Sequence, residues 1–326
     1  MTGEDMRALA AQLTGDTVAN VVPVGGGGNN RLYRVVGARE EYALKRYAGD
    51  GDGARERYER EFGGLRFLWG EGVRCVPEPV ALAPEAGVAI YRWVAGEPAG
   101  AVLGGDIEAL AGFVARLHAL RLAPGAQGLG PAREAVTSPA ELNRQIERRV
   151  ERLRGVAAEH PGLGGLLDEI AAEALRRSGT QPGAVALAAH RLTLSPSDFG
   201  LHNALRTAAG LVFVDFEYFG WDDPVKLVAD VLWHPGMELA QRERRKFFTL
   251  AADVYGVDPE FSTRFNRDAP LYGLRWALIV LNEFLPEVWD RRVAAGQAAE
   301  RSCVLELQLA KAAGLLDRVR RNAVPA

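Results

Sequence analysis

One short stretch of the chain places an aspartate, an asparagine and a second aspartate at a restrictive spacing. Asp198 lies in the segment Ser195–Asn203, five positions before Asn203. Twelve residues after Asn203, an apolar run over 211–214 ends in Asp215. Aspartate and asparagine are also common in ordinary loops, because they cap and bend the backbone. The strand-like run that ends in a carboxylate makes the arrangement more specific than a loop alone.

These three residues have the spacing that the catalytic loop of a kinase requires. In such a loop one carboxylate meets the acceptor hydroxyl, while the amide and the second carboxylate hold the metal on the ATP phosphates. We therefore expect Asp198 to be the catalytic residue. We expect Asn203 and Asp215 to be the metal ligands, with ATP and Mg²⁺ as cofactors.

A glycine run near the N-terminus indicates phosphate binding. It lies between two strand-like segments, 21–24 and 32–36. Glycine lets the backbone approach a phosphate closely and point N–H groups at it. The run is not a Walker A loop, because no Gly-Lys-Ser/Thr follows it, and a flexible hairpin tip is the plain alternative. The residues expected to contact nucleotide here are Gly25, Gly26, Gly27, Gly28 and Asn30.

A lysine follows on the next predicted strand, 42–47. Lys45 could reach the α- and β-phosphates of ATP from this strand, although an exposed strand lysine is the alternative. A carboxylate on the following helix must hold it. We expect Glu61 to do so, with Glu59 and Glu56 as competitors, because only one face of the helix can turn toward the lysine.

Taken in order, these motifs resemble the aminoglycoside phosphotransferase and choline kinase-like family, whose members are relatives of the protein kinases. The resemblance covers nearly the whole chain from about residue 21. It implies an α+β, two-lobed protein kinase-like fold, with a small β-rich N-lobe (1–94), a larger helical C-lobe (95–326) and ATP between them. It also implies an adenine-gripping hinge and makes Glu217 a second metal ligand or an acceptor contact. The hinge residues are Tyr91, Trp93 and Val94.

Two departures from the family pattern indicate a divergent subgroup. The family usually has His-Gly before the catalytic aspartate, where this chain has Pro196-Ser197. Ser195 or Ser197 could take over the hydrogen bonds of that histidine. The family also usually has an aspartate three residues after the Asp-Pro that follows the metal motif, where this chain has Leu227. Neither change removes an expected metal or phosphate ligand.

Hydrophobic spacing places most of the helices after the N-terminal strands. Another strand is expected over 88–94, and Gly-Pro punctuation after it marks the boundary between the lobes. The helices are expected near 4–14, 55–70, 107–120, 138–156, 163–177, 237–255, 259–266, 271–293 and 298–320.

Composition limits the partners. The chain has 326 residues, is 48% hydrophobic and 25% charged, and has a net charge of −3. It lacks the basic excess that binds nucleic acid through phosphate neutralisation. No apolar run is long enough to span a bilayer, so we expect no membrane partner. Its two cysteines, Cys75 and Cys303, form no metal or disulfide pattern, which fits a cytoplasmic location. The oligomeric state is open.

The acceptor is expected to be the hydroxyl of a small molecule: an aminoglycoside, sugar, amino alcohol or natural product. No long activation segment ending in Ala-Pro-Glu follows Asp215, which disfavours a protein substrate. Glu283, Glu287 and Asp290 share a predicted helix face that could bind a polyamine-like antibiotic or could be a solvated surface. Arg275 could instead meet an anionic acceptor. A nucleotide-binding pseudokinase that acts as a scaffold or sensor is the alternative. The residues expected near the acceptor are Glu217, Trp221, Asp222, Arg275, Asn282 and Glu283.

Overall fold

The N-terminal part of the chain is a five-stranded antiparallel sheet with one helix on each face. The computed structural model describes residues 3–25, 30–47, 52–178, 185–294 and 299–321. The strand order in the sheet is β1-β2-β3-β5-β4. The elements of this part are α1 (Gly3–Thr14), β1 (Val18–Val24), β2 (Asn30–Gly37), β3 (Glu41–Tyr47), α2 (Asp52–Gly70), β4 (Pro79–Ala83) and β5 (Val88–Arg92).

The sheet turns its two faces to different cores. Leu44 of β3 and Ile90 of β5 are fully buried with Met6 of α1 on one face. Because side chains alternate along a strand, Lys45 faces the opposite side, where α2 lies. Tyr47 and Tyr91 on that side belong to the large core that continues into the rest of the chain. The alternation of the sequence therefore sends the lysine toward the centre of the molecule.

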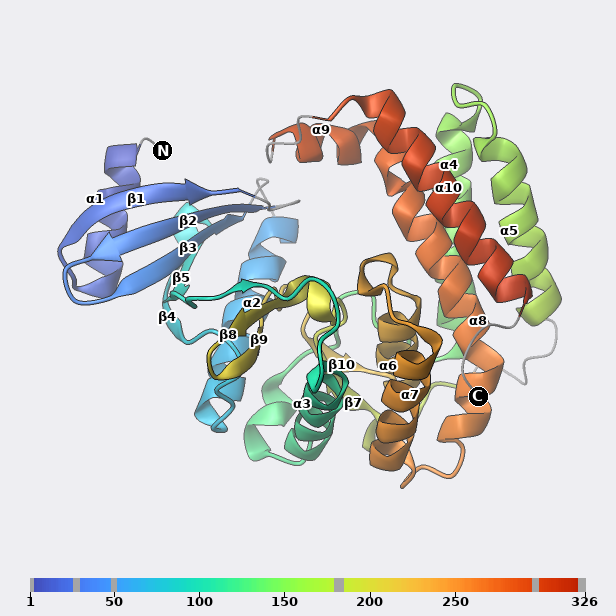
Figure 1. Cartoon of the computed structure of the whole chain (residues 1–326), viewed down its shortest axis with the longest axis horizontal. Coiled ribbons are helices and arrows are strands. Elements are labelled where there is room, and N and C mark those ends of the chain that lie inside the picture. The colour runs from blue at the N-terminus through green and yellow to red at the C-terminus, as the bar shows by residue number, and fades with distance from the viewer. Residues whose placement is uncertain (1–2, 26–29, 48–51, 179–184, 295–298, 322–326) are drawn as a thin grey trace.

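The remainder of the chain is mostly helical and is built around α8. Helix α8 packs against α4, α5, α6 and α10, and Figure 1 shows α4, α5, α8 and α10 grouped away from the N-terminal sheet. The helices are α3 (Asp106–Leu120), α4 (Pro139–Ala157), α5 (Leu163–Ser178), α6 (Pro224–Trp233), α7 (Gln241–Tyr255), α8 (Phe261–Val280), α9 (Pro286–Ala294) and α10 (Arg301–Arg320).

Short strands lie before α3 and between α5 and α6. Strand β7 pairs with β10, and β8 pairs with both β6 and β9. The strands are β6 (Glu97–Pro98), β7 (Thr193–Ser195), β8 (Ala204–Thr207), β9 (Gly210–Phe213) and β10 (Gly220–Asp222). The catalytic candidates lie in the connections β7–β8 and β9–β10. Among the described helices, none is long and apolar enough to cross a membrane.

Three expectations about helices are corrected. Helix α8 is continuous through Pro270, where two separate helices were expected. Its flanking side chains are buried, so packing outweighs the roughly 3 kcal/mol that an interior proline costs. The expected helix over 271–293 is broken, because Leu285 before Pro286 is extended (φ −75°, ψ 123°) and α9 begins at the proline. Helix α6 was not predicted at all.

Candidate active site

The lysine of β3 lies between two carboxylates from distant parts of the chain. Lys45 Nζ is 2.8 Å from Glu61 Oε2 of α2 and 2.6 Å from Asp215 Oδ1, which follows β9. The two competing glutamates, Glu56 and Glu59, pair with arginines of their own helix. Burial alone would lower the pKa of Lys45, but Asp215 and Glu61 hold that pKa well above its usual value. The ammonium group is therefore charged and positioned at the junction of the two lobes.

Glu61 is held by a second layer of contacts. The hydroxyl of Tyr47 donates a hydrogen bond to Glu61 Oε2 at 2.6 Å, and the hydroxyls of Tyr47 and Tyr91 lie 3.0 Å apart. Helix α2 also packs closely against the segment after Asp215, because a Cβ at Gly64 would come within 2.5 Å of the Phe219 ring. Burial raises the pKa of Glu61, and Lys45 opposes that rise. The close packing of α2 at Gly64 and the hydrogen bond from Tyr47 together position the Glu61 carboxylate beside Lys45.

The structure brings Asp198, Asn203 and Asp215 together. The Asn203 side chain donates from Nδ2 to the Asp198 carbonyl at 2.9 Å. The Asn203 carbonyl accepts from Val214 N–H, also at 2.9 Å, which places the loop beside the residue before Asp215. Asp215 has φ 66°, a left-handed conformation that costs a non-glycine residue about 1–3 kcal/mol and often marks functional sites.

The oxygen atoms left over in this cluster suit a hard metal ion. Within the described residues, no hydrogen bond reaches Asn203 Oδ1 or Asp215 Oδ2. The first is an amide oxygen and the second a carboxylate oxygen, and Mg²⁺ prefers oxygen ligands of these kinds. Mg²⁺ commonly takes only one or two protein ligands beside phosphate and water. Glu217 lies near Asp215, but it is 2% exposed and accepts a hydrogen bond from Asn30 Nδ2 at 2.8 Å. The donor set therefore fits the expected metal at Asn203 and Asp215.

The Asp198 carboxylate is contacted by two histidines that the sequence analysis did not identify. His202 Nε2 lies 3.0 Å and His234 Nε2 lies 3.4 Å from the same oxygen, Oδ1. Burial alone would raise the pKa of Asp198, but these hydrogen bonds hold it well below its usual range. His202 is next to Asn203 in the sequence and was within reach of motif analysis. His234 follows α6, and nothing in the sequence connects it to the loop.

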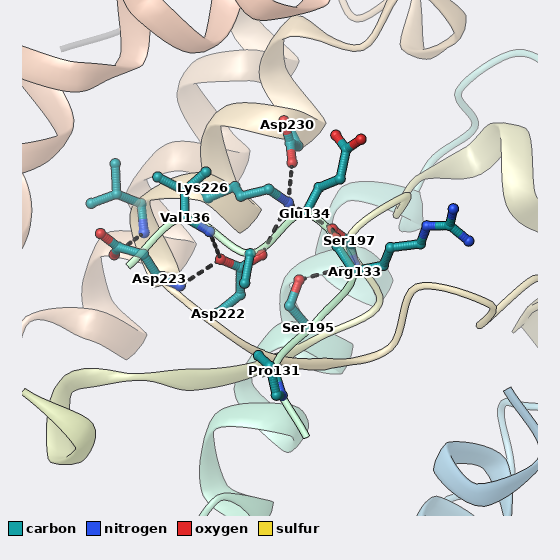
Figure 2. A network of polar contacts seen from close by, with 12 residues as sticks. Pro131, Arg133, Glu134, Val136, Ser195, Ser197, Asp222, Asp223, Lys226 and Asp230 are labelled. Carbon is teal, nitrogen blue, oxygen red and sulfur yellow. Dashed lines mark hydrogen bonds and ion pairs between the residues drawn. The ribbon is translucent and has the colours of Figure 1, made fainter. Parts of the chain in front are cut away.

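The loop that lacks the usual histidine is braced from α6 instead. Ser197 N–H donates to Ser195 Oγ at 3.0 Å, and Lys226 Nζ donates to Ser197 Oγ at 2.6 Å. Lys226 is fully buried and forms ion pairs of 3.0 Å with Asp222 and 2.9 Å with Asp230. Figure 2 shows this lysine between the two carboxylates, beside Ser197 of the loop that carries Asp198. Both serines are therefore engaged, and Lys226 is a supporting residue that the sequence analysis missed.

Several residues expected near the acceptor lie in buried or paired positions. Asp222 is fully buried, and its Oδ1 accepts from Val136 N–H and Asp223 N–H (Figure 2). Arg275 is 4% exposed and bonds Gln145, Glu134 and Asp230. The indole N–H of Trp221 donates to the Ala126 carbonyl at 3.1 Å. An acceptor contact by Asp222 or Arg275 requires this network to open, so their role stays a prediction.

Two of the three carboxylates of the expected acidic face pair with arginines. Glu283 Oε1 lies 2.9 Å from Arg292 Nε, and Glu287 Oε1 lies 2.5 Å from Arg152. Asn282 begins this segment, and its carbonyl accepts from Leu285 N–H. Glu283 and Glu287 therefore carry paired charges, and because the expected helix breaks at Leu285 they do not lie on one continuous helix.

Only some of the residues expected to contact nucleotide are among the described residues. Gly26, Gly27 and Gly28 lie outside the described residues, while Gly25 follows the end of β1. At the expected hinge, Trp93 N–H donates to the Glu41 carbonyl at 2.9 Å, and Val94 follows it into the connection to β6. The expected hinge therefore begins at the end of β5, beside the start of the strand that carries Lys45.

A separate cavity of about 820 Å³ lies beyond Asp223, the N-cap of α6. Its walls come from the start of α4, residues 185–191 and the first half of α8, and none of the expected site residues lines it. Burial raises the pKa of Asp223 to about 6, against the effect of Arg264. This cavity is distinct from the cluster around Asp198.

Comparison with known proteins agrees with this arrangement. The model of the phosphotransferase enzyme family matches residues 20–260. Among the curated proteins, none matches the chain significantly. Spectinomycin phosphotransferase in complex with ADP and spectinomycin is 12% identical, with a TM-score of 0.62 over 97% of this chain and 98% of that one.

Two further solved structures have the same fold. A choline kinase from Cryptosporidium parvum Iowa II is 14% identical, with a TM-score of 0.64 over 99% of this chain and 98% of the other. A putative aminoglycoside phosphotransferase from Ralstonia eutropha JMP134 is 17% identical, with a TM-score of 0.62 over 98% of both chains. The predicted two-lobed, protein kinase-like α+β fold is thus confirmed. The family match includes both the strand of Lys45 and the loop of Asp198, and the chain belongs to the phosphotransferase enzyme family.

Proposed function

We propose that this protein transfers the γ-phosphoryl group of ATP to a hydroxyl of a small molecule. The observation that carries the proposal is the convergence of Lys45, Asp198, Asn203 and Asp215 from both lobes. Residues 1–94 would hold the nucleotide, and residues 95–326 would supply the catalytic loop and the acceptor site. Because ATP is the donor, we place the reaction in the cytoplasm.

Each charged group has a separate task in this reaction. Lys45 would bind the ATP phosphates from the side of α2, since Glu61 already orients its ammonium group. Asn203 and Asp215 would hold Mg²⁺, which when bound neutralises charge on the transferring phosphoryl group. Such sites work by alignment and charge neutralisation rather than by covalent chemistry.

Asp198 would orient the acceptor hydroxyl and take up its proton. The acceptor oxygen forms a bond to the γ-phosphorus as the bond from that phosphorus to the β–γ bridging oxygen breaks, and ADP leaves with that electron pair. The hydroxyl proton passes to Asp198 and then to solvent. The lowered pKa of Asp198 makes it a weak base, which suits a loose transition state in which proton transfer comes late.

The paired charges of the C-terminal helices favour a neutral or singly charged acceptor over a polycation. Glu283 and Glu287 each have an arginine partner, so they offer a polyamine-like molecule little unpaired negative charge. Sugars, amino alcohols and natural-product hydroxyls fit this surface better than a highly charged aminoglycoside does.

The test is ADP release with Mg²⁺-ATP against separate pools of aminoglycosides, sugars, amino alcohols and nucleosides. Acceptor-dependent release that is nearly abolished in Asp198→Asn supports the proposal, because general-base assistance is typically worth about 10²–10⁴-fold. ATP binding without acceptor-dependent release from any pool would instead favour a pseudokinase.

A further inference from the structure

Two imidazole rings from different elements meet the catalytic candidate on one side. His202 belongs to the turn η4 (Leu201–Asn203), and His234 follows the last residue of α6. Their rings are stacked with centroids 3.7 Å apart and an angle of 2° between the planes. Both Nε2 atoms approach Asp198 Oδ1, at 3.0 and 3.4 Å. No hydrogen bond from the described residues reaches Oδ2 of the same carboxylate.

The position of the His234 ring is set by its other neighbours. The edge of the ring meets Trp276, with centroids 4.3 Å apart at 74°. The Trp276 indole N–H donates in turn to Asp230 at 2.8 Å, the carboxylate that also pairs with Lys226. The ring is therefore packed between a buried tryptophan and the second imidazole, which leaves it little freedom to rotate.

One hydrogen bond determines which nitrogen of His234 carries the proton. The backbone N–H of Gly236 donates to His234 Nδ1 at 3.0 Å. A neutral imidazole has one donor and one acceptor nitrogen, so an acceptor at Nδ1 leaves the proton on Nε2. Burial lowers the pKa of His234, which keeps the ring neutral. The Nε2–H group then points at Asp198 as a hydrogen-bond donor.

The direction of the hydrogen bond from Gly236 to His234 argues against a metal ion bound by Asp198 and the two histidines. Asp198, His202 and His234 are close enough together to ligate one ion. A histidine that binds a metal through Nε2 needs a lone pair there, and its Nδ1–H usually donates to an acceptor. At His234 the Gly236 contact runs the opposite way. The cluster is organised for hydrogen bonding to the carboxylate.

We propose that His202 and His234 are positioning residues that hold Asp198 Oδ1 and leave Oδ2 to meet the acceptor hydroxyl. This inference rests on the proposed function, in which Asp198 contacts the acceptor. It explains how a loop with Pro196-Ser197 before the aspartate keeps its carboxylate oriented: the histidines come from after the aspartate and from the end of α6. Neither imidazole needs to contact the substrate.

The kinetic test uses two substitutions of one residue. His234→Phe keeps a ring in the stack but removes the donor, and His234→Gln restores an N–H near the position of Nε2. We expect His234→Phe to lower kcat about 10- to 100-fold, the size of a lost hydrogen bond to a charged group, with KM for ATP unchanged. His234→Gln should recover most of this loss. His190→Phe, at an exposed histidine of η3 (Ala189–Arg191), is the matched control and should retain wild-type kinetics.

Unchanged kcat in His234→Phe, or an equal loss in His234→Phe and His234→Gln, would overturn the proposal. The second result would show that restoring an N–H donor near the position of Nε2 does not restore kcat, so the hydrogen bond would not be what supports it. Thermal unfolding of each variant separates a misfolded protein from one that has lost only the hydrogen bond.

A measurement without turnover separates this inference from the proposed function. In ¹⁵N-labelled protein, the His234 imidazole, assigned by its loss in His234→Phe, should show the proton on Nε2. Its Nε2 resonance should shift in Asp198→Ala. A proton on Nδ1, or a resonance insensitive to Asp198→Ala, overturns the positioning role even if the enzyme is active. The expected tautomer in a protein that phosphorylates no acceptor would leave the hydrogen-bond geometry supported and the proposed reaction wrong.

Discussion

Lys45 Nζ lies 2.6 Å from Asp215 Oδ1, although 170 residues separate them along the chain. Lys45 lies in the N-terminal sheet, and Asp215 follows strand β9, after the loop that carries Asp198. The contact fixes the distance between the expected phosphate-binding group and the expected metal ligand. This ion pair joins the two lobes at the expected active site.

Replacement of Lys45 by methionine should remove this contact with little loss of packing volume. We expect kcat/KM for ATP to fall at least about 100-fold, as when a preorganised donor is removed from a charged transition state. Arg46→Met on the same strand is the control, since that side chain lies on the other face of the sheet. Steady-state kinetics with varied ATP measure both, and comparable losses in the two variants would contradict the role of Lys45.

Lys226 should matter for stability as well as for the loop. It is fully buried between Asp222 and Asp230, so Lys226→Met leaves the buried Asp222 carboxylate without a cation and Asp230 with only the longer contact to Arg275, at 3.5 Å. Breaking a buried pair in this way typically costs about 3–5 kcal/mol. We expect a loss of this size in the free energy of unfolding, measured by urea denaturation.

Lys246→Met is the control for that experiment. Lys246 pairs with Glu108 at the protein surface, where solvent screens the interaction. Its unfolding curve should superimpose on that of the wild type. If Lys226→Met also unfolds like the wild type, the ion pairs of Lys226 with Asp222 and Asp230 do not stabilise the folded protein.

His118 should make the protein sensitive to acid. Burial, with a smaller effect of Arg121, lowers its pKa to about 4 in the folded state, against about 6.5 when unfolded. Between these values the unfolded chain binds more protons, so stability falls as the pH falls from about 6.5 toward 4. His118→Gln should flatten this part of the profile of unfolding free energy against pH, whereas His190→Gln should not. An unchanged slope in His118→Gln would show that other groups cause the acid sensitivity.

Asn203→Ala should raise the requirement for Mg²⁺. The substitution removes the amide oxygen expected to ligate the metal and also the hydrogen bond to the Asp198 carbonyl. We expect the Mg²⁺ concentration for half-maximal activity to rise at least about tenfold. EDTA should abolish activity in the wild type, and excess Mg²⁺ should restore it. Asn20→Ala, at an exposed position of β1, is the control, and a wild-type Mg²⁺ requirement in Asn203→Ala would argue against it as a ligand.

The resemblance carried by the order of motifs along the chain was enough to predict the fold, and Lys45, Glu61 and Asp215 do meet in the structure. The strand of Lys45 and the helix of Glu61 have clear periodicity, so their facing sides followed from the sequence. Helix α6 was missed: it has only ten residues, all of them buried, and its two charged residues, Lys226 and Asp230, pair with each other inside the protein rather than facing solvent. Lys226 was missed with it, and so was His234 at its end.

The acceptor candidates show a different limit. Arg275 and Glu283 have the residue types that bind charged ligands, but Arg275 pairs with Glu134, 141 residues away, and Glu283 pairs with Arg292 beyond the break at Leu285. Periodicity places a side chain on a helix face and does not reveal what packs against that face. Pairing with Glu134 or Arg292 could therefore be seen only once the helices were placed in three dimensions.

The most direct test of the account is transfer of the γ-phosphoryl group itself. ATP labelled in its γ-phosphate would be incubated with Mg²⁺, the protein and the acceptor found by ADP release, and the label would be followed into the acceptor for wild type and Asp198→Asn. The account predicts labelled acceptor with the wild type, and almost none with Asp198→Asn despite unchanged ATP binding. Equal labelling by both proteins would contradict the assignment of Asp198, and label found only in inorganic phosphate would contradict a small-molecule kinase.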